Sequence, residues 1–413
     1  NETKRGASMK VCGVIAEYNP FHNGHRYQLS EARRMTKSDV MVVAMSGNFV
    51  QRGAPALLDK WTRAEIALRN GADIVVEMPI LGSVQSADLF ARAGIRLLQA
   101  MQCDAFAFGA EEGTAEDFIS HSRFLREHEA EINRIFQTYR NDGRTYAAQL
   151  ETAIAEILSP GGSAISFSTP NNQLGLAYVK ENEQFPEPME TAIVLRRGAG
   201  HNDSEAFGEE FASGTAIREW ALHHGKQSEG NGMGRFVPEE TLEALERLPL
   251  LDWAAYWGML QYQLMLLSHA ELRNIYQVEE GIEYRLKKEA EDAADFMAFI
   301  RRTKNKRWTW ARLQRVCTYI LLGITKAEAH AFQEKADTIR LLGFTEAGRR
   351  YLNSLKKNTE TPIVTKLREP HTAGLQLEIR SDRIYRLGGL PVLDEQNFTR
   401  SPIYIRNELH NLK

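Results

Sequence analysis

The sequence predicts an α/β protein with a doubly wound parallel sheet, a second, mostly helical domain and a small C-terminal sheet. Short apolar runs alternate with stretches of helical spacing through the first half of the 413 residues. That alternation is typical of right-handed βαβ crossovers. A segment rich in Gly, Ser and Asn at 226–234 indicates a mobile loop or a domain boundary. Beyond it, helical patterns dominate 238–355, and Pro, Gly and β-branched residues favour a small sheet from 361 onward.

Each element of the first half is predicted by its own pattern. Apolar runs of strand length predict buried strands at 10–16, 40–45, 72–78, 103–109 and 191–195. Apolar residues at helical spacing predict helices at 24–35, 60–70, 86–101 and within 114–158, and a further helix begins at Ser213. We therefore expect a Rossmann-like catalytic domain at 9–225 and a mostly helical domain at 235–413.

Composition narrows the class of protein. The formal net charge of −3 excludes a uniformly basic nucleic-acid coat and leaves room for a local basic patch. Cys12, Cys103 and Cys317 lack the spacing of metal-binding or redox pairs, so we expect a reducing, cytoplasmic location. No apolar run is long enough to span a membrane. The polar residues 1–8 precede Met9 and lack the apolar core of a signal peptide, and we expect them to be an expression remnant.

The first candidate site follows the first predicted strand. There His22, Gly24 and His25 form an HxGH motif that opens the first helix, at the sheet edge where ligands bind in open α/β folds. A helix start offers free N–H groups to phosphate, and both rings could donate to oxygens that gain charge at an α-phosphate. We predict nucleotidyl transfer from ATP with His22 and His25 as the catalytic residues. Two ordinary loop histidines are the alternative, and a metal site is disfavoured because no third ligand stands at helical spacing.

A second helix start is predicted at Ser213-Gly214-Thr215-Ala216-Ile217-Arg218. Ser and Thr are good helix caps, and an arginine one turn into the helix could clamp a phosphate with its fork of donors. The alternative is a plain cap with a surface arginine. Beside an HxGH motif, a second phosphate-binding helix start is the better interpretation.

The stretch 301–315 holds seven Arg or Lys residues and no acid, with two tryptophans interleaved. Clustered cations neutralise phosphates, and aromatic faces stack unpaired bases. We therefore expect this stretch to bind single-stranded RNA, with a solvated helix and core tryptophans as the alternative. The candidate tRNA-binding residues are Lys304, Lys306, Arg307, Trp308, Arg312 and Arg315.

Taken in order, these features resemble the HIGH-type nucleotidyltransferase superfamily. Asn19 stands where those proteins often carry Asp, and Gly214 interrupts their usual Ser-Ser-Thr, so an ordinary member is not indicated. A closer resemblance is to the bacterial tRNA(Met) cytidine acetate ligases. It is carried by the segments 16–25, 45–53, 108–111, 170–175, 304–307 and 312–315.

The resemblance implies a two-step reaction. Acetate and ATP give acetyl-adenylate and pyrophosphate, and the acetyl group then passes to the wobble cytidine of elongator tRNA(Met), forming N4-acetylcytidine. It implies an ATP site built from Gly109, Asn171 or Asn172, Arg196 or Arg197, and most of the segment 15–28. In that segment the implied residues are Ile15, Ala16, Glu17, Tyr18, Asn19, Pro20, Phe21, His22, Asn23, Gly24, His25 and Gln28. The helix-start residues Ser213, Thr215 and Arg218 would add to the same ATP site.

Acetate needs a small pocket close to that site. The candidates follow the second predicted strand and are Ser46, Asn48, Gln51 and Arg52, the last of which could pair with the carboxylate. We expect Mg²⁺ to accompany ATP, although no carboxylate cage is evident, and we predict no membrane association and no protein partner. Two rival functions remain: an adenylyl- or cytidylyltransferase acting on a small phosphorylated substrate, and a non-enzymatic RNA-binding protein with a degenerate nucleotide domain.

Overall fold

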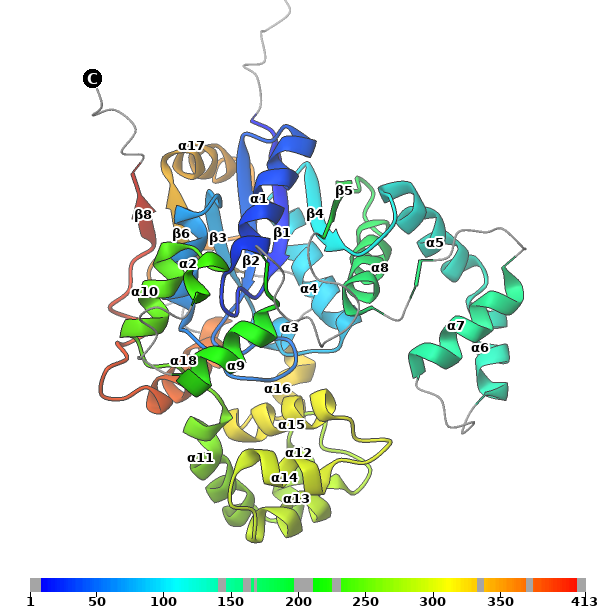
Figure 1. The fold of residues 1–413 in the computed structure, drawn as a ribbon, viewed down its shortest axis with the longest axis vertical. Coiled ribbons are helices and arrows are strands. Elements are labelled where there is room, and N and C mark those ends of the chain that lie inside the picture. Colours follow the sequence, from blue (N-terminus) through cyan, green and yellow to red (C-terminus); the bar gives the residue numbers. More distant parts are fainter. Residues whose placement is uncertain are drawn as a thin grey trace, which may run out of the picture.

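The computed structural model describes residues 9–139, 146–158, 165–166, 169–196, 211–224, 232–332, 338–368 and 374–406. In these ranges an eight-stranded sheet carries helices on both faces, and a helical region lies beyond the carboxyl ends of its parallel strands (Figure 1). The strands are β1 (Val11–Ala16), β2 (Val40–Ser46), β3 (Ile74–Met78), β4 (Ala105–Ala110), β5 (Glu190–Leu195), β6 (Ile339–Thr345), β7 (Ile363–Val364) and β8 (Ile403–Ile405).

The first five strands form the predicted doubly wound sheet. They run parallel in the order β5-β4-β1-β2-β3, which confirms the Rossmann-like fold class. The winding direction reverses between β1 and β4. In such sheets ligands bind at this reversal, beside the loops that follow the two strands.

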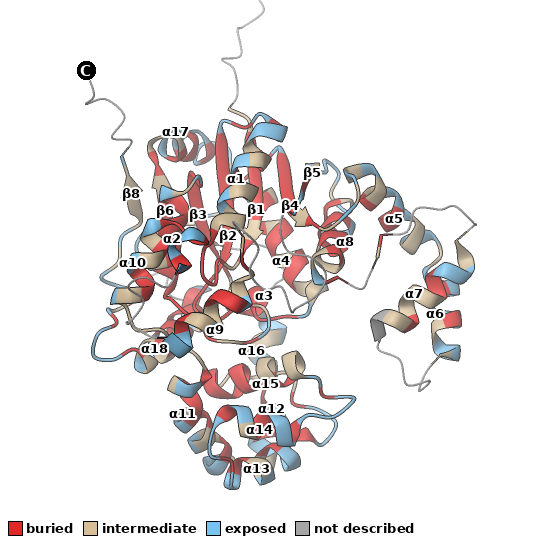
Figure 2. Ribbon diagram, in the orientation of Figure 1, coloured by how far each residue is buried: buried red, intermediate tan, exposed pale blue. Residues whose placement is uncertain are grey.

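Both faces of the sheet are buried, because alternate side chains of each strand point to opposite sides. Cys12 and Val14 of β1 pack on one side and Val11 packs on the other. The strands β1, β2, β3, β4 and β6 are accordingly buried along most of their length, whereas β8 at the edge is partly exposed (Figure 2). The first side is covered by α1 (Asn23–Thr36), α2 (Lys60–Arg69), α9 (Gly214–His224), η1 (Met233–Arg235) and α10 (Glu239–Arg247). The second is covered by α4 (Ala87–Ala100), α5 (Ala115–Glu127), α8 (Pro170–Asn182) and α17 (Glu346–Leu355).

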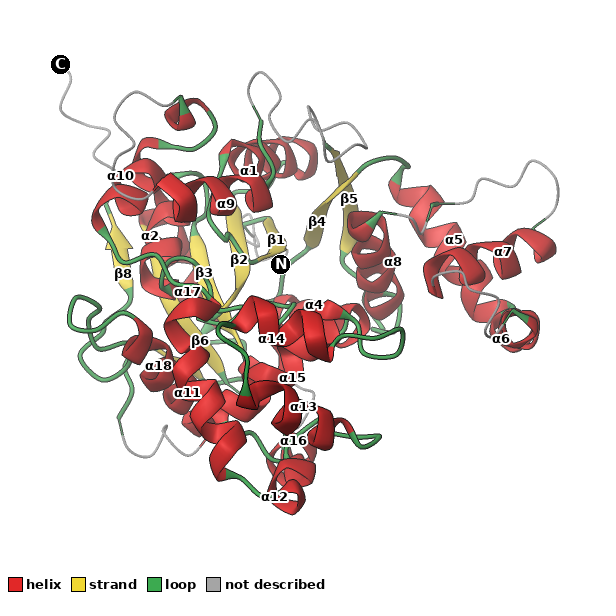
Figure 3. Cartoon of the chain, turned by 60° about the horizontal axis from the view of Figure 1, so that its bottom comes forward, coloured by secondary structure: helices red, strands yellow, loops and turns green. Residues whose placement is uncertain are grey.

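The helical region has a core of its own. It contains α11 (Trp253–Leu266), α12 (His269–Asn274), α13 (Ile282–Glu291), α14 (Phe296–Thr303), α15 (Trp310–Leu322) and α16 (Lys326–Ala331). These pack beside α18 (Gln376–Gly388), as Figure 3 shows, and against Ile80 and Leu81 of α3 (Ile80–Ser83). A helix pair, α6 (Glu129–Thr138) and α7 (Tyr146–Ile157), projects to one side of the molecule, beyond α5 (Figure 1). None of the described helices is long and apolar enough to cross a membrane.

The C-terminal strands differ from the prediction. The expected small C-terminal sheet is instead an extension of the main sheet: β6 pairs antiparallel with β3, and β7 and β8 both pair with β6. The segment of β6 was expected to be helical. It is a short apolar run buried along nearly its whole length, and such a run does not distinguish a strand from a buried helix. The boundary at 226–234 therefore does not end the sheet, because the chain returns to it after the helical region.

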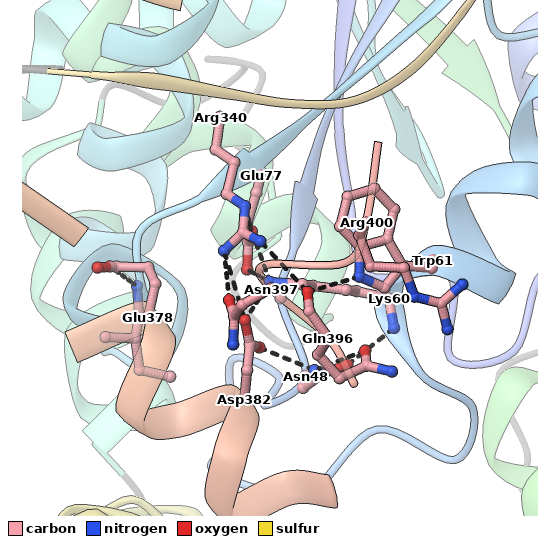
Figure 4. A network of polar contacts seen from close by, with 12 residues as sticks. Asn48, Lys60, Trp61, Glu77, Arg340, Glu378, Asp382, Gln396, Asn397 and Arg400 are labelled. Carbon is pink, nitrogen blue, oxygen red and sulfur yellow. Dashed lines mark hydrogen bonds and ion pairs between the residues drawn. The ribbon is translucent and has the colours of Figure 1, made fainter. Parts of the chain in front are cut away.

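A buried network of charges attaches the C-terminal part of the chain to the sheet (Figure 4). The ammonium of Lys60 donates to both carboxylate oxygens of Glu77, at 2.7 Å each, and to Asp382 at 2.6 Å. Arg340 lies 3.5 Å from Glu77 and 3.4 Å from Asp382. Two cations thus face two anions, and all four side chains are at most 5% exposed. Charges can be buried at tolerable cost when they are paired and hydrogen-bonded in this way.

Replacing Lys60 with Met should lower the free energy of unfolding. Two carboxylates would then remain buried with Arg340 as their cation, and breaking a buried pair typically costs about 3–5 kcal/mol. Urea unfolding followed by circular dichroism measures the loss. The exposed pair of Arg69 and Glu65 on α2 supplies the control, since Arg69→Ala should change stability by less than about 0.5 kcal/mol. Equal stability of the two variants would contradict a stabilising role for the network.

Candidate functional site

The two histidines of the HxGH motif cap α1 and stack on one another. Nδ1 of His22 accepts the N–H of Gly24 at 3.1 Å, and Nδ1 of His25 accepts the N–H of His22 at 3.2 Å. The ring centroids are 3.7 Å apart. Since Nδ1 is an acceptor in both rings, each neutral imidazole carries its proton on Nε2. The motif therefore presents two Nε2–H donors side by side.

Burial keeps both rings neutral. Together with the positive charges of Arg196 and Arg218, burial lowers the pKa of His22 to about 3. Burial also holds the pKa of His25 well below its usual value, with further contributions from His22 and Arg196. At neutral pH the pair offers oriented hydrogen bonds to an anion, and the positive charge comes from the neighbouring arginines.

The second predicted helix start lies directly against the first. A β-carbon at Gly214 would lie 3.6 Å from the carbonyl oxygen of Asn19 and 3.9 Å from the ring of His22. Arg218 donates to that same carbonyl at 2.7 Å and to the hydroxyl of Thr215 at 3.0 Å. The hydroxyl of Ser213 accepts the N–H of Ala216 at 3.1 Å and so caps the helix. The structure thus brings both predicted phosphate-binding helix starts, those of α1 and α9, to one place.

Many side chains of the segment 15–28 hold its loop in shape. Glu17 accepts the N–H of Gln51 at 2.7 Å, and the amide oxygen of Asn19 accepts the N–H of Leu57 at 2.8 Å. The side-chain amide of Asn23 donates to the carbonyl oxygen of Arg235 at 2.7 Å. Buried apolar or aromatic surface is contributed by Ala16, Tyr18, Pro20 and Phe21, and Ile15 is partly buried. These residues build the wall of the site, and their polar side chains are largely used within it.

Gly109, Gln28 and Arg196 come together across the reversal between β1 and β4. A β-carbon at Gly109 would lie 3.6 Å from Cγ of Arg196 and 3.9 Å from the amide nitrogen of Gln28. Next to them, the amide of Asn171 donates to Glu111, whose carboxylate is 4.0 Å from Nε of Arg196. Four of the residues implied by the resemblance, namely Gly109, Gln28, Asn171 and Arg196, therefore lie close together.

The structure separates the two candidate asparagines. Asn172 is fully buried, accepts the N–H of Glu111 at 3.4 Å and donates to Glu112 and Ser166. Asn171 is partly exposed at the start of α8, which makes it the better candidate for contact with a ligand. Arg196 directly follows β5 and lies within electrostatic range of both histidines, whereas Arg197 lies outside the described residues.

The loop after β2 requires one correction. Asn48, expected in an acetate pocket, is 1% exposed. Its amide nitrogen donates to Asp382 at 2.8 Å and its oxygen accepts the N–H of Lys60 at 2.8 Å (Figure 4). The side chain is committed to the buried charge network and has no polar atom left for acetate. The amide of Gln51 donates to the carbonyl of Gln85 at 2.6 Å, and Arg52 is exposed.

Ser46 keeps a free group within this loop. It is fully buried, and its hydroxyl has no hydrogen-bond partner in the part of the chain that the structure describes. Buried hydroxyls are normally paired. Ser46 therefore remains a candidate for contact with a small polar ligand.

Sequence reasoning missed Arg63, which organises the entrance to the site. This fully buried side chain donates to the carbonyl of Glu17 at 2.6 Å, of Ser46 at 3.1 Å and of Leu58 at 2.9 Å, and also to that of Gly47. One guanidinium thus joins the chain beyond β1 to the chain at the end of β2. One signal in the sequence could have identified Arg63: it shares a face of α2 with the small apolar residues Ala64 and Ala67. A charged residue on a buried helix face is expected to have a specific partner, because charged residues are almost never fully buried unless paired.

The basic stretch also requires a correction. Trp308 is 3% exposed and belongs to the core of the helical region, so its ring cannot stack an RNA base. Arg312 lies over that ring at 3.7 Å. Arg307 and Arg312 share Glu280 at 3.6 and 3.7 Å. Lys304 and Lys306 are exposed.

Metal ligands do not gather in the described part of the chain: no group of three His, Cys, Asp or Glu side chains there is placed to hold an ion. All three cysteines are buried and unbridged. The groups at this site that can bind an anion are the Nε2–H donors of the two histidines and the neighbouring guanidinium groups of Arg196 and Arg218.

Comparison with known proteins places this chain in a family. A protein-family model described as HIGH Nucleotidyl Transferase matches residues 9–397. The tRNA(Met) cytidine acetate ligase of Latilactobacillus sakei is 40% identical over 410 residues, covering 97% of this chain and 100% of the relative. That of Listeria monocytogenes is 38% identical over 381 residues, covering 92% and 95%.

Solved structures agree with these matches. Thermotoga maritima TmcAL in its apo form superposes with a TM-score of 0.85 at 28% identity, covering 96% of this chain and 100% of that one. The same protein bound with alpha-thio ATP gives a TM-score of 0.84 at 28% identity with the same coverage.

The low pKa of the histidines can be tested directly. In protein labelled with ¹⁵N-histidine, the rings of His22 and His25 should stay neutral with the proton on Nε2 from pH 8 to pH 5, whereas an ordinary histidine titrates near 6.5. Below pH 6.5 these histidines are protonated in the unfolded chain but remain neutral in the folded protein. The free energy of unfolding should therefore decrease as the pH falls below 6.5. His22→Asn and His25→Asn assign the two signals. Titration of both rings near pH 6.5 would contradict the predicted burial effect.

Proposed function

The chain belongs to the tRNA(Met) cytidine acetate ligase family of HIGH nucleotidyl transferases, and on that basis we propose that it activates acetate with ATP and acetylates the wobble cytidine of elongator tRNA(Met). The observation that carries the proposal is the pair of neutral histidines between two helix starts, with Arg218 and Arg196 beside them. This arrangement suits an anion that gains charge during reaction.

In the first step the acetate carboxylate attacks the α-phosphate of ATP in line. A bond forms between a carboxylate oxygen and phosphorus, the bond to the β-phosphate oxygen breaks, and pyrophosphate leaves. The Nε2–H groups of His22 and His25 donate to the α-phosphate oxygens as negative charge builds there. No side-chain nucleophile is required, because the substrate itself attacks.

In the second step the exocyclic amine of cytidine attacks the acetyl carbonyl of the adenylate. A carbon–nitrogen bond forms, the bond to the phosphate oxygen breaks, and AMP leaves while the amine loses a proton. The products are AMP and N4-acetylcytidine.

Residues at the carboxyl ends of the parallel strands can be assigned to the adenosine and to the phosphates of ATP. Gly109, Gln28 and Asn171 form the wall at the reversal point, where we place the adenosine. Arg196, Arg218 and the α9 start with Ser213 and Thr215 lie toward the phosphates. ATP would bring Mg²⁺ with it. Since that ion keeps much of its shell as phosphate oxygens and water, this site needs few protein ligands for it.

Acetate and tRNA are assigned to opposite sides of the loop after β2. Ser46 and Gln51 remain our candidates for the acetyl side of the pocket, Asn48 is withdrawn, and the exposed Arg52 is moved from the acetyl side to the tRNA side. Lys304, Lys306 and Arg307 supply exposed positive charge for the tRNA backbone, and the partly buried Arg312 lies beside them. We propose a cytoplasmic location, where ATP and tRNA occur together.

Acetate dependence separates this proposal from an ordinary adenylyl- or cytidylyltransferase. Labelled pyrophosphate should exchange into ATP only when acetate is supplied, because acetate is the attacking group in the reversible first step. Formate and a phosphorylated alcohol are the matched alternatives. Exchange that ignores acetate and responds to the phosphorylated compound would establish the rival activity.

Loss of either histidine donor should slow activation without unfolding the protein. His22→Asn keeps a good helix cap and removes the Nε2–H donor, and His25→Ala removes the second donor. Removing one preorganised donor typically lowers the rate about 100- to 1000-fold, so acetate-dependent exchange should fall by that amount. Circular dichroism checks the fold, and Arg69→Ala serves as the neutral control. Near-normal exchange in both histidine variants would remove the motif from the chemistry.

A further inference from the structure

Five arginines follow one another from the catalytic histidines to the exposed basic stretch: Arg218, Arg52, Arg315, Arg312 and Arg307. Arg218 donates to the carbonyl of Asn19. Gln314, the neighbour of Arg315, donates to the carbonyl of Arg52 at 3.5 Å. Arg312 donates to the carbonyl of Arg307 at 3.4 Å. Burial lowers the pKa of Arg218 and of Arg315, and the positive charge of Arg52 lowers each of them further, so Arg52 lies within electrostatic range of both.

A backbone contact fixes the middle of this row. Gly53 has a φ of +85°, and a β-carbon there would lie 2.5 Å from the backbone nitrogen of Arg315. The hydroxyl of Thr318 donates to the carbonyl of Gly53. The helix α15 is therefore pressed directly onto the loop that follows β2. That contact places Arg315 at the catalytic edge of the sheet, although it belongs to the basic stretch.

Arg315 differs from its outer neighbours in having no acid. Its Nε is buried without a hydrogen-bond partner among the described residues, whereas Arg307 and Arg312 share Glu280. Arg52 likewise has no side-chain partner in the described part of the chain. The nearby acids are Glu17, whose carboxylate accepts the N–H of Gln51, and Glu219 beside Arg218. A buried guanidinium donor without a partner is unfavourable unless an anion completes it.

We propose that Arg52 and Arg315 form a phosphate-binding subsite for the RNA backbone, next to the nucleotide that receives the acetyl group. The inference rests on the proposed function and names how that site holds its second substrate. We assign the phosphates of ATP to Arg218 and Arg196. Both arginines are near enough to His22 for their positive charges to lower its pKa. The row continues outward through Arg312 and Arg307, and a continuous row of cations suits a polymer whose phosphates recur along its length.

The subsite predicts a division between the two steps of the reaction. Arg52→Ala and Arg315→Met, the second of which keeps the apolar stem, should leave acetate-dependent pyrophosphate exchange within about twofold of the parent protein. Transfer of labelled acetyl to a tRNA(Met) transcript at saturating tRNA should fall by about tenfold to a hundredfold, because a misplaced reactant is lost from the transition state. The slope of the logarithm of the tRNA binding constant against the logarithm of the salt concentration should become shallower by about one for each lost phosphate contact.

Two control variants separate an effect on tRNA binding from an effect on acetyl transfer. Arg307→Ala, at the outer end of the row, should also lower the salt dependence by about one unit and leave transfer at saturating tRNA intact. Arg69→Ala should change neither. Arg52 is exposed, so its variant decides the question if Arg315→Met proves unstable.

Other outcomes overturn the subsite and identify its replacement. A raised KM for ATP in the exchange assay would assign the arginines to the triphosphate, and a raised KM for acetate in the Arg52 variant would return that residue to the acetyl pocket. Normal transfer and normal tRNA binding in both variants would leave Arg315 as a packing residue. Failure of the parent protein to show acetate-dependent exchange would instead refute the proposed function, and that result appears before any variant is compared.

Discussion

The guanidinium of Arg63 holds together the two loops on which the whole site is built. It donates to main-chain carbonyls beyond β1 and at the end of β2, and those loops carry the histidine motif and the proposed acetyl and RNA contacts. Main-chain carbonyls accept hydrogen bonds without adding a full negative charge, so the arginine fixes the loops through the backbone, while Asp59, Glu17 and Glu77 are the carboxylates in electrostatic range. Burial lowers the pKa of Arg63, and the hydrogen bonds to four carbonyls offset the cost of removing its charge from water. The helix α2 thereby acts as a rigid support for the site, and its Lys60 attaches the C-terminal part of the chain to the same support.

Positive charge and neutral donors are divided among different residues around the anion site. His22 is buried and His25 is partly buried, and both rings are neutral and fixed by backbone N–H groups, so they need no reorganisation as charge develops on a phosphate. The arginines lie around them at the rim of the sheet. This separation suits a reaction in which the substrate supplies the nucleophile, since the protein then has only to orient reactants and stabilise charge.

The fold could be predicted where local pattern decided it. The five parallel strands are apolar runs of strand length, and the HxGH and Ser-Gly-Thr motifs mark helix starts whose convergence follows from the topology. Residues decided by distant partners could not be predicted. Asn48 is satisfied by Asp382, more than 300 positions away, and Trp308 is buried by helices that precede and follow it. The strand β6 was misjudged because its apolar run fits a buried helix equally well, and only its pairing with β3 decides between them. The roles of the individual ATP, acetate and tRNA residues remain proposals.

The pairing of β3 with β6 also governs how this protein is made. Thr345 donates to Asp73, 272 positions earlier in the chain, so β3 has an open edge until the chain has emerged from the ribosome at least as far as Thr345. An unpaired edge of apolar strand is a template for association with other chains, and contacts of such sequence separation form slowly. The catalytic sheet is thus most vulnerable during synthesis, and its histidine motif is complete long before its outer edge is protected. A nascent chain of this family would gain from chaperone cover over that interval.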